Sequence, residues 1–214
     1  MQNLKQNIPN NKLKVYNSLK YLYERCYTIL TTILTRVIFY CNNINHGKFR
    51  SIGLPLIDAA NNSTCIFGDH FALVNNARFA TLGKSNRCKI VVYSGAKLTL
   101  GNNIGMSNTT IVASQSIIIG NNILIGGGVT IVDTDFHSLN PVHWHTENDE
   151  KNMISAPVTI SDNVFIGMDS VILKGVTIGS NVIIGAGSVV SKSIPDNQIW
   201  AGNPARYIRD NNTW

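Results

Sequence analysis

Charged and aromatic residues are both scarce in this chain of 214 residues. Asp, Glu, Lys and Arg together make up 14% of it, and Phe, Trp and Tyr make up 8%. Gly and Asn are common, and both are residues of tight turns. This composition fits a β-rich fold with many turns better than a helical one, and the length suggests one domain with an appendage or at most two small domains.

Metal-type cysteine spacing is absent. Cys26, Cys41, Cys65 and Cys88 form no CxxC pair, and their spread is typical of reduced thiols in a cytosolic protein. We also expect no cleavable signal peptide, because the first 25 residues are polar and carry lysines. The sequence therefore predicts a cytoplasmic protein.

Acidic residues are nearly absent from the N-terminal part of the chain. Residues 1–50 carry eight Lys or Arg and one acid, whereas residues 51–214 carry ten Lys or Arg and eleven acids. The basic character thus belongs to the N-terminal segment and not to the body. Because no nucleic-acid-binding motif occurs either, we expect no nucleic-acid partner.

An internal repeat is the strongest signal in the sequence. Over residues 160–195 an aliphatic residue recurs at every sixth position, at Ile160, Ile166, Ile172, Ile178, Ile184 and Val190. A period of six fits neither a helix nor a simple alternating strand, but it fits a short strand, a turn and another short strand. The turn sequences GNN, SDN and GSN tolerate positive φ. Stacked units bury what one unit cannot, so the architecture is a solenoid.

The pattern aliphatic-Gly-x-x-small-x resembles the hexapeptide-repeat acyltransferases, most closely the maltose, galactoside and polysaccharide O-acetyltransferases. The resemblance implies an all-β solenoid, a left-handed parallel β-helix with three strands per turn, assembled as a homotrimer. We expect a basic helical segment at 1–50, the β-helix at 51–195 with an inserted loop at 132–157, and a C-terminal cap and coenzyme A-binding tail at 196–214. The same fold also serves as a structural module and as a metal-dependent hydratase.

The period breaks at the stretch DTDFHSLNPVHWH, and His137 lies where this loop leaves the coil. A loop histidine is either a turn residue or a proton acceptor. The resemblance favours the second reading, because related sugar acetyltransferases carry their general-base histidine at this place, before a Pro-Val-His-like stretch. Here that stretch is Pro141 to His143. Whether Asp135 orients His137 or faces the acceptor stays open, as does the role of Asp133.

Three further residues have a weaker link to the acceptor or to a metal. The resemblance puts Asn108 near the acceptor and His143 in the loop, although Asn108 also suits a turn and His143 and His145 also suit loop packing. We take Asn108, His143 and Asp135 as candidate acceptor-binding residues. We expect no metal, because His137, His143 and His145 would all have to converge from one short loop.

The donor implied by the resemblance is acetyl-CoA. By resemblance, Met168 and Ala186 line a groove for its pantetheine arm, and their spacing of eighteen residues stacks their N–H groups one coil apart. The tail sequence AGNPAR resembles the family's own C-terminal tail. Lys192, Arg206 and Arg209 are the cations available there for the phosphates.

One long helix is predicted over residues 13–40. Its apolar seam repeats at intervals of three and four, at Tyr16, Leu19, Tyr23, Cys26, Leu30, Ile33, Val37 and Tyr40. The seam either packs on the solenoid or its trimer mates, or docks on a membrane surface through residues 12–41. Arg36 and four threonines argue against a membrane-spanning helix.

The expected function is acetyl transfer from acetyl-CoA to a hydroxyl of a sugar or surface-polysaccharide precursor, at active sites between subunits. His137 acts as general base in a direct ternary-complex transfer. The basic N-terminal segment favours an acceptor at the inner face of the membrane. Alternatives are an N-acetyltransferase of amino sugars, a xenobiotic acetyltransferase, a metal-dependent hydratase and a non-catalytic solenoid.

Overall fold

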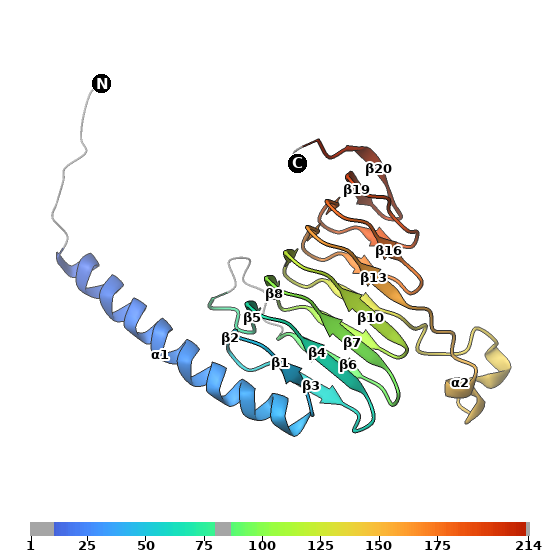
Figure 1. Cartoon of the computed structure of the whole chain (residues 1–214), viewed down its shortest axis with the longest axis horizontal. Coiled ribbons are helices and arrows are strands. Elements are labelled where there is room, and N and C mark those ends of the chain that lie inside the picture. The colour runs from blue at the N-terminus through green and yellow to red at the C-terminus, as the bar shows by residue number, and fades with distance from the viewer. Residues whose placement is uncertain (1–10, 80–86, 213–214) are drawn as a thin grey trace.

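The computed structural model describes residues 11–79 and 87–212. Parts of the predicted segments 1–50 and 196–214, namely residues 1–10 and 213–214, lie outside these described residues. The chain begins with helix α1 (Asn11–Cys41) and continues as short strands that wind into a parallel β-helix (Figure 1). The predicted helix at 13–40 is confirmed.

Three sheets form the three sides of the β-helix, and every third strand lies on the same side. Sheet A contains β1 (Asn45–His46), β4 (Thr64–Phe67), β7 (Lys97–Leu100), β10 (Ser116–Ile119), β13 (Val158–Ile160) and β16 (Thr177–Ile178). Sheet B contains β2 (Phe49–Ile52), β5 (Phe71–Val74), β8 (Ile104–Ser107), β11 (Ile123–Ile125), β14 (Phe165–Ile166), β17 (Ile183–Ile184), β19 (Gln198–Gly202) and β20 (Ala205–Asp210). Sheet C contains β3 (Leu56–Ala59), β6 (Lys89–Val92), β9 (Thr110–Ala113), β12 (Thr130–Val132), β15 (Val171–Ile172) and β18 (Val189–Val190).

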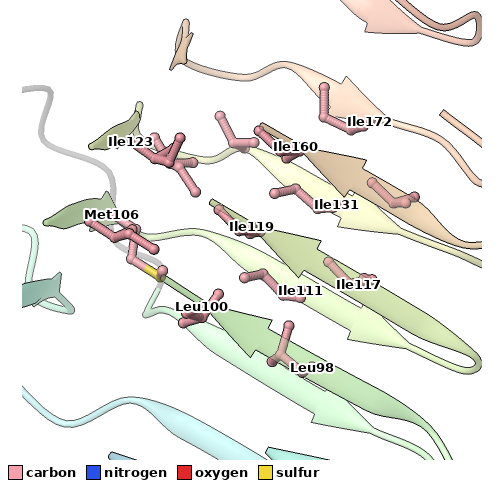
Figure 2. Packing of buried hydrophobic residues seen from close by; sticks show 14 of the residues in the cluster. Leu98, Leu100, Met106, Ile111, Ile117, Ile119, Ile123, Ile131, Ile160 and Ile172 are labelled. Carbon is pink, nitrogen blue, oxygen red and sulfur yellow. The ribbon is translucent and has the colours of Figure 1, made fainter. Parts of the chain in front are cut away.

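The six-residue period sets the register of these sheets. Ile166 pairs with Ile184, and Ile160 pairs with Ile178, so residues eighteen apart lie one above the other. The buried aliphatic side chains, among them Ile117, Ile131, Ile160 and Ile172, lie in the interior and stack into a continuous apolar column (Figure 2). The solenoid predicted from the repeat is therefore confirmed, and its first coil starts at β1, a few residues before the predicted boundary at 51.

Asparagines hold the corner between sheets A and B. Asn122, Asn163, Asn181 and Asn197 all have φ between 57° and 59°, in the left-handed region that Asn tolerates. Their side-chain amides form a ladder from coil to coil, with N···O distances of 2.7, 3.0 and 2.8 Å. The ladder explains why the turn sequences repeat as GNN, SDN and GSN.

Helix α1 lies across the N-terminal end of the β-helix (Figure 1). Its threonines satisfy the backbone of the first strand of sheet B: Thr31 donates to the Ser51 carbonyl, and Thr32 accepts from the Ser51 N–H at 2.9 Å. Phe39 is fully buried and closes the end of the core against Phe49. An edge strand presents unpaired polar groups, and the threonine face of α1 meets this demand.

The apolar seam predicted on α1 is not its packed face. Leu30, Ile33 and Val37 are exposed, so of the alternatives left open by the sequence, packing of this seam on the solenoid of its own chain is excluded. The physical reason is that Thr31 and Thr32, on the other side of the helix, form hydrogen bonds with the backbone of Ser51. Among the described residues, no helix has the length and apolar character required to cross a membrane.

Two features interrupt or extend the regular coils. The loop 133–157 links β12 in sheet C to β13 in sheet A, contains a 3-10 turn (Pro141–His143) and helix α2 (Asn148–Lys151), and projects from the side of the β-helix (Figure 1). At the far end, β19 pairs with β17, and β20 returns antiparallel to β19. The C-terminal segment therefore lengthens sheet B beyond the last hexapeptide.

Candidate functional site

His137 makes a hydrogen-bonded pair with Asp149. Its Nδ1 lies 2.8 Å from Asp149 Oδ2, and Asp149 Oδ1 accepts from the Ser138 N–H at 2.8 Å. These hydrogen bonds, first that of His137 and then that of Ser138, hold the pKa of Asp149 below its usual value. An ionised carboxylate only accepts hydrogen bonds, so His137 carries its proton on Nδ1 and leaves Nε2 as an acceptor. The imidazole is largely exposed.

Ser138 fixes the loop around this pair. Ser138 is buried, its Oγ lies 2.9 Å from His143 Nδ1, and its carbonyl accepts from Trp144 Nε1 at 2.7 Å. His143, predicted to bind the acceptor, therefore has a partner within the loop. Its acceptor-binding role stays a prediction.

Asp133 and Asp135 have separate partners, neither of them His137. Asp133 is fully buried and accepts from the backbone N–H groups of Ser114, Gln115 and Ser116 at 2.6–2.8 Å, which ties the base of the loop to the preceding turn. Asp135 Oδ2 lies 3.0 Å from Lys174 Nζ. In this structure Asp149, and not Asp135, hydrogen-bonds to the His137 imidazole.

A groove of about 460 Å³ follows one corner of the β-helix and is lined by three predicted residues, Asn108, Met168 and Ala186. Asn108 is buried with φ 50°, so it also serves as the turn residue that its type suggests. Met168 and Ala186 occupy equivalent positions in successive coils, as their spacing predicted. Among the described residues, neither of their N–H groups donates a hydrogen bond.

Glycines that line this groove allow the backbones of neighbouring coils to lie close together. A Cβ on Gly126 would lie 2.6 Å from the Met168 nitrogen, and one on Gly167 would lie 2.4 Å from the Ala186 nitrogen. Only glycine allows the coils to approach so closely. Part of the groove lining is therefore backbone, alongside side chains such as Phe165 and Ile183.

The predicted tail cations lie beyond the groove. Arg206 and Arg209 are on β20, paired in register with Ala201 and Ile199 of β19, which is the next strand of sheet B after β17. Both side chains are exposed and reach only nearby carbonyls, at 3.2 Å. Lys192 is exposed after β18. All three lie at the C-terminal end of the β-helix.

The histidine and the groove lie at different corners of one chain. The groove residues Gly126, Gly167 and Gly185 follow strands of sheet B, where the chain turns toward sheet C. The loop that carries His137 leaves sheet C toward sheet A. His137 lines a second pocket with Trp144, His145 and Asp149. One chain therefore holds the two halves of the predicted site apart.

No group of three or more His, Cys, Asp or Glu side chains in residues 11–79 and 87–212 could hold a metal ion. Two of the loop histidines instead use Nδ1 for contacts within the loop. His137 Nδ1 contacts Asp149, and His143 Nδ1 contacts Ser138.

Comparison with known proteins supports the repeat and the fold. The family model described as bacterial transferase hexapeptide (six repeats) matches residues 157–192. The galactoside O-acetyltransferase of Escherichia coli K12 is 43% identical over 137 residues, which cover 63% of this chain and 65% of that protein. The chain carries hexapeptide repeats and folds as a β-helix. The resemblance to hexapeptide-repeat acyltransferases is thereby confirmed.

Two solved structures agree with this assignment. The N-acyltransferase AntD from Bacillus cereus, in complex with dTDP and 3-hydroxybutyryl-CoA, has a TM-score of 0.63 at 18% identity, covering 82% of this chain and 87% of that one. A maltose O-acetyltransferase from Clostridium difficile 630 has a TM-score of 0.50 at 35% identity, covering 56% and 63%. The hexapeptide-repeat fold is a left-handed parallel β-helix, as predicted.

Sequence reasoning missed Asp149 and Ser138. The segment TENDEKN offers three acids, Glu147, Asp149 and Glu150, and nothing in its spacing separates them. Asp149 follows His137 by twelve residues, and only the folded loop brings the two together. Ser138 gave no signal beyond its position next to His137.

Proposed function

We propose that this protein transfers an acetyl group from acetyl-CoA to a hydroxyl group of a sugar or of a surface-polysaccharide precursor. The observation that carries the proposal is the His137–Asp149 pair, because it leaves Nε2 of an exposed imidazole ready to accept a proton. The sequence similarity to a galactoside O-acetyltransferase supports hydroxyl transfer.

Coenzyme A is the donor that suits the groove. The pantetheine arm has amide groups that can accept from the N–H groups of Met168 and Ala186, one coil apart. The phosphates would meet Lys192, Arg206 and Arg209 at the end of sheet B and beyond β18. A guanidinium suits phosphate through its planar fork of donors, and an ammonium suits it as a point charge.

The transfer takes place in one step within a ternary complex. Nε2 of His137 removes the proton of the acceptor hydroxyl, whose oxygen attacks the thioester carbonyl carbon. A backbone N–H at the groove stabilises the oxyanion. The carbon–sulfur bond then breaks, and the coenzyme A thiolate takes the proton from the imidazolium. Asp149 keeps the imidazole in the required tautomer and supports its positive charge.

The complete site forms between protomers of a homotrimer. In one chain His137 and the groove belong to different corners of the β-helix, which supports a site that pairs the loop of one protomer with the groove of its neighbour. Asn108 lines the groove and is the predicted acceptor residue that best suits this arrangement.

A reducing compartment suits the cysteines. All four lie within the described residues and are free thiols. Cys88 is buried, and burial raises the pKa of its thiol to about 11, so it is a weak nucleophile. We place the protein in the cytoplasm, as its sequence predicts.

A thiol-release assay with acetyl-CoA tests the proposal across neutral sugars, glycans and amino sugars. Wild-type protein should release thiol with a hydroxyl acceptor, and His137→Ala should lower turnover roughly 10²- to 10⁴-fold. His70→Asn, which alters an exposed histidine on another turn, should retain full activity.

Three results would contradict this proposal. Near-full turnover by His137→Ala would exclude His137 as the base. Release with amino sugars alone would indicate N-acetylation. Absence of heat on titration with acetyl-CoA would indicate a solenoid without this activity.

A further inference from the structure

Helix α1 leaves a long apolar face uncovered. Thr31, Thr35 and Phe39 face the coils and are buried, whereas large apolar side chains on the opposite side are exposed. These include Leu19, Leu22, Leu30, Ile33, Leu34 and Val37. At 100° per residue, this outer face contains no charged residue from Val15 to Cys41, a length of roughly 40 Å. Contiguous apolar surface of this extent marks a binding surface.

Cations border this apolar face. Lys14, Arg25 and Arg36 are exposed and spaced by eleven residues, which is three helical turns, so they form a row parallel to the helix axis. Lys20 lies on the other border, 3.8 Å from Glu24, which is the only acid of the helix. A lengthwise apolar stripe with a flanking row of basic residues is typical of a helix that lies in a membrane surface.

We propose that the outer face of α1 docks on the surface of a lipid bilayer that contains anionic lipids. Charge decides between a bilayer and a second copy of this chain. Residues 1–50 carry eight Lys or Arg and one acid, so two copies facing each other would bring cation rows together. An anionic lipid surface attracts the same rows. Each Lys or Arg that lies within about one Debye length of the surface contributes to this attraction.

The orientation of α1 suits this occupant. The helix crosses the N-terminal end of the β-helix (Figure 1). Its apolar side chains are exposed, whereas Thr31, Thr35 and Phe39 are buried against the coils. Lys48 and Arg50 line a shallow pocket at the same end and add to its positive charge. The inference goes beyond the proposed reaction and does not depend on it.

Flotation with vesicles tests this docking. We expect the whole chain to float with phosphatidylcholine vesicles that contain about one third phosphatidylglycerol. Its binding to pure phosphatidylcholine vesicles should be roughly tenfold weaker or more. Raising the salt concentration should weaken the binding to the anionic vesicles. Lys14→Gln with Arg25→Gln should reduce this preference several-fold, roughly.

Two substitutions two residues apart provide the matched control. Leu19→Glu places a charge within the apolar face and should weaken vesicle binding roughly tenfold or more. Asn17→Glu adds the same charge on the opposite side of the helix and should weaken vesicle binding by less than about fivefold. Both residues are exposed, so both variants should keep the wild-type unfolding temperature.

A fluorophore at Cys26, which lies within the apolar face, gives a second measurement in a Cys41→Ser background. Its emission should shift to the blue with anionic vesicles. Three results would overturn the proposal. The first is equal binding to neutral and anionic vesicles, and the second is an equal effect of Leu19→Glu and Asn17→Glu on vesicle binding. The third is an absence of vesicle binding, together with a wild-type assembly in solution whose mass is reduced by Leu19→Glu. The last result would assign the face to a second copy. Thiol release from soluble acceptors is unaffected by any of these outcomes.

Discussion

Asp149 holds the imidazole of His137 through a hydrogen bond. The imidazole is largely exposed, and without a fixed partner its ring could rotate and change tautomer. Asp149 accepts from Nδ1 on one oxygen and from the Ser138 N–H on the other, so the carboxylate is fixed at both ends. The pKa of Asp149 is lower in the folded protein than in the unfolded chain. Its hydrogen bonds therefore contribute fully to stability above the unfolded-state pKa, and this contribution is lost as the pH falls through the folded-state pKa.

Replacing Asp149 should slow the reaction without abolishing it. We expect Asp149→Ala to lower kcat/KM roughly 10- to 100-fold, because the imidazole loses its orientation. The difference in rate between Asp149→Ala and the wild type should shrink as the pH falls through the lowered pKa of Asp149, because a protonated carboxyl no longer holds the imidazole in one tautomer. Glu150→Ala, an exposed acid on the same short helix, is the control and should leave both measurements unchanged. Unchanged kinetics in Asp149→Ala would show that the pair is structural only.

The loop illustrates what the sequence can and cannot predict. The broken repeat located the loop at 132–157 and singled out His137, and the loop indeed lies between β12 and β13. The choice of Asp149 over Asp135 depends on the backbone path of the loop, which no repeat constrains. Asp135 is closer to His137 in sequence, but Lys174 from the neighbouring coil pairs with it.

At the scale of elements, the coil is the part that sequence predicts best. In the two-residue strands β14 to β18 a period of six leaves one inward aliphatic residue per strand, and the stacked register follows from it. Helix α1 shows the limit of pattern reasoning. Its spacing of three and four predicts an apolar stripe, but not which side meets the solenoid, because Ser51 and Gly53 select the threonine face through hydrogen bonds.

Glycine at 167 should be required for both stability and donor binding. A Cβ there would meet the Ala186 backbone, which cannot move without parting the coils, so we expect Gly167→Ala to destabilise the fold by about 1–3 kcal/mol. Gly105→Ala, on β8 of the same sheet, is the matched control, because its Cβ would meet only the flexible end of Leu124. Thermal unfolding and the KM for acetyl-CoA measure the two effects. Equal stability of the two variants would contradict the close-packing argument.

At the scale of the whole molecule, the features used in the proposals lie at separate places along and around the β-helix. Helix α1 covers the N-terminal end, and the tail cations lie at the C-terminal end (Figure 1). Between them, the groove and the His137 loop lie at different corners. The trimer was predicted from resemblance, and the separation of the two half-sites gives it a chemical purpose in the proposed reaction.

Mixed trimers test most directly whether the active site combines His137 of one protomer with the groove of another. His137→Ala keeps its groove, and Ala186→Trp, at an exposed groove position, blocks the groove but keeps His137. Each variant alone should be almost inactive. Differently tagged copies are co-expressed, and trimers that carry both tags are isolated and assayed for thiol release.

In every mixed trimer, one of the three interfaces pairs an intact histidine with an intact groove. The mixed trimers should therefore recover about one third of the wild-type activity. Mixed trimers no more active than either parent would contradict a shared site and would return the whole reaction to a single protomer.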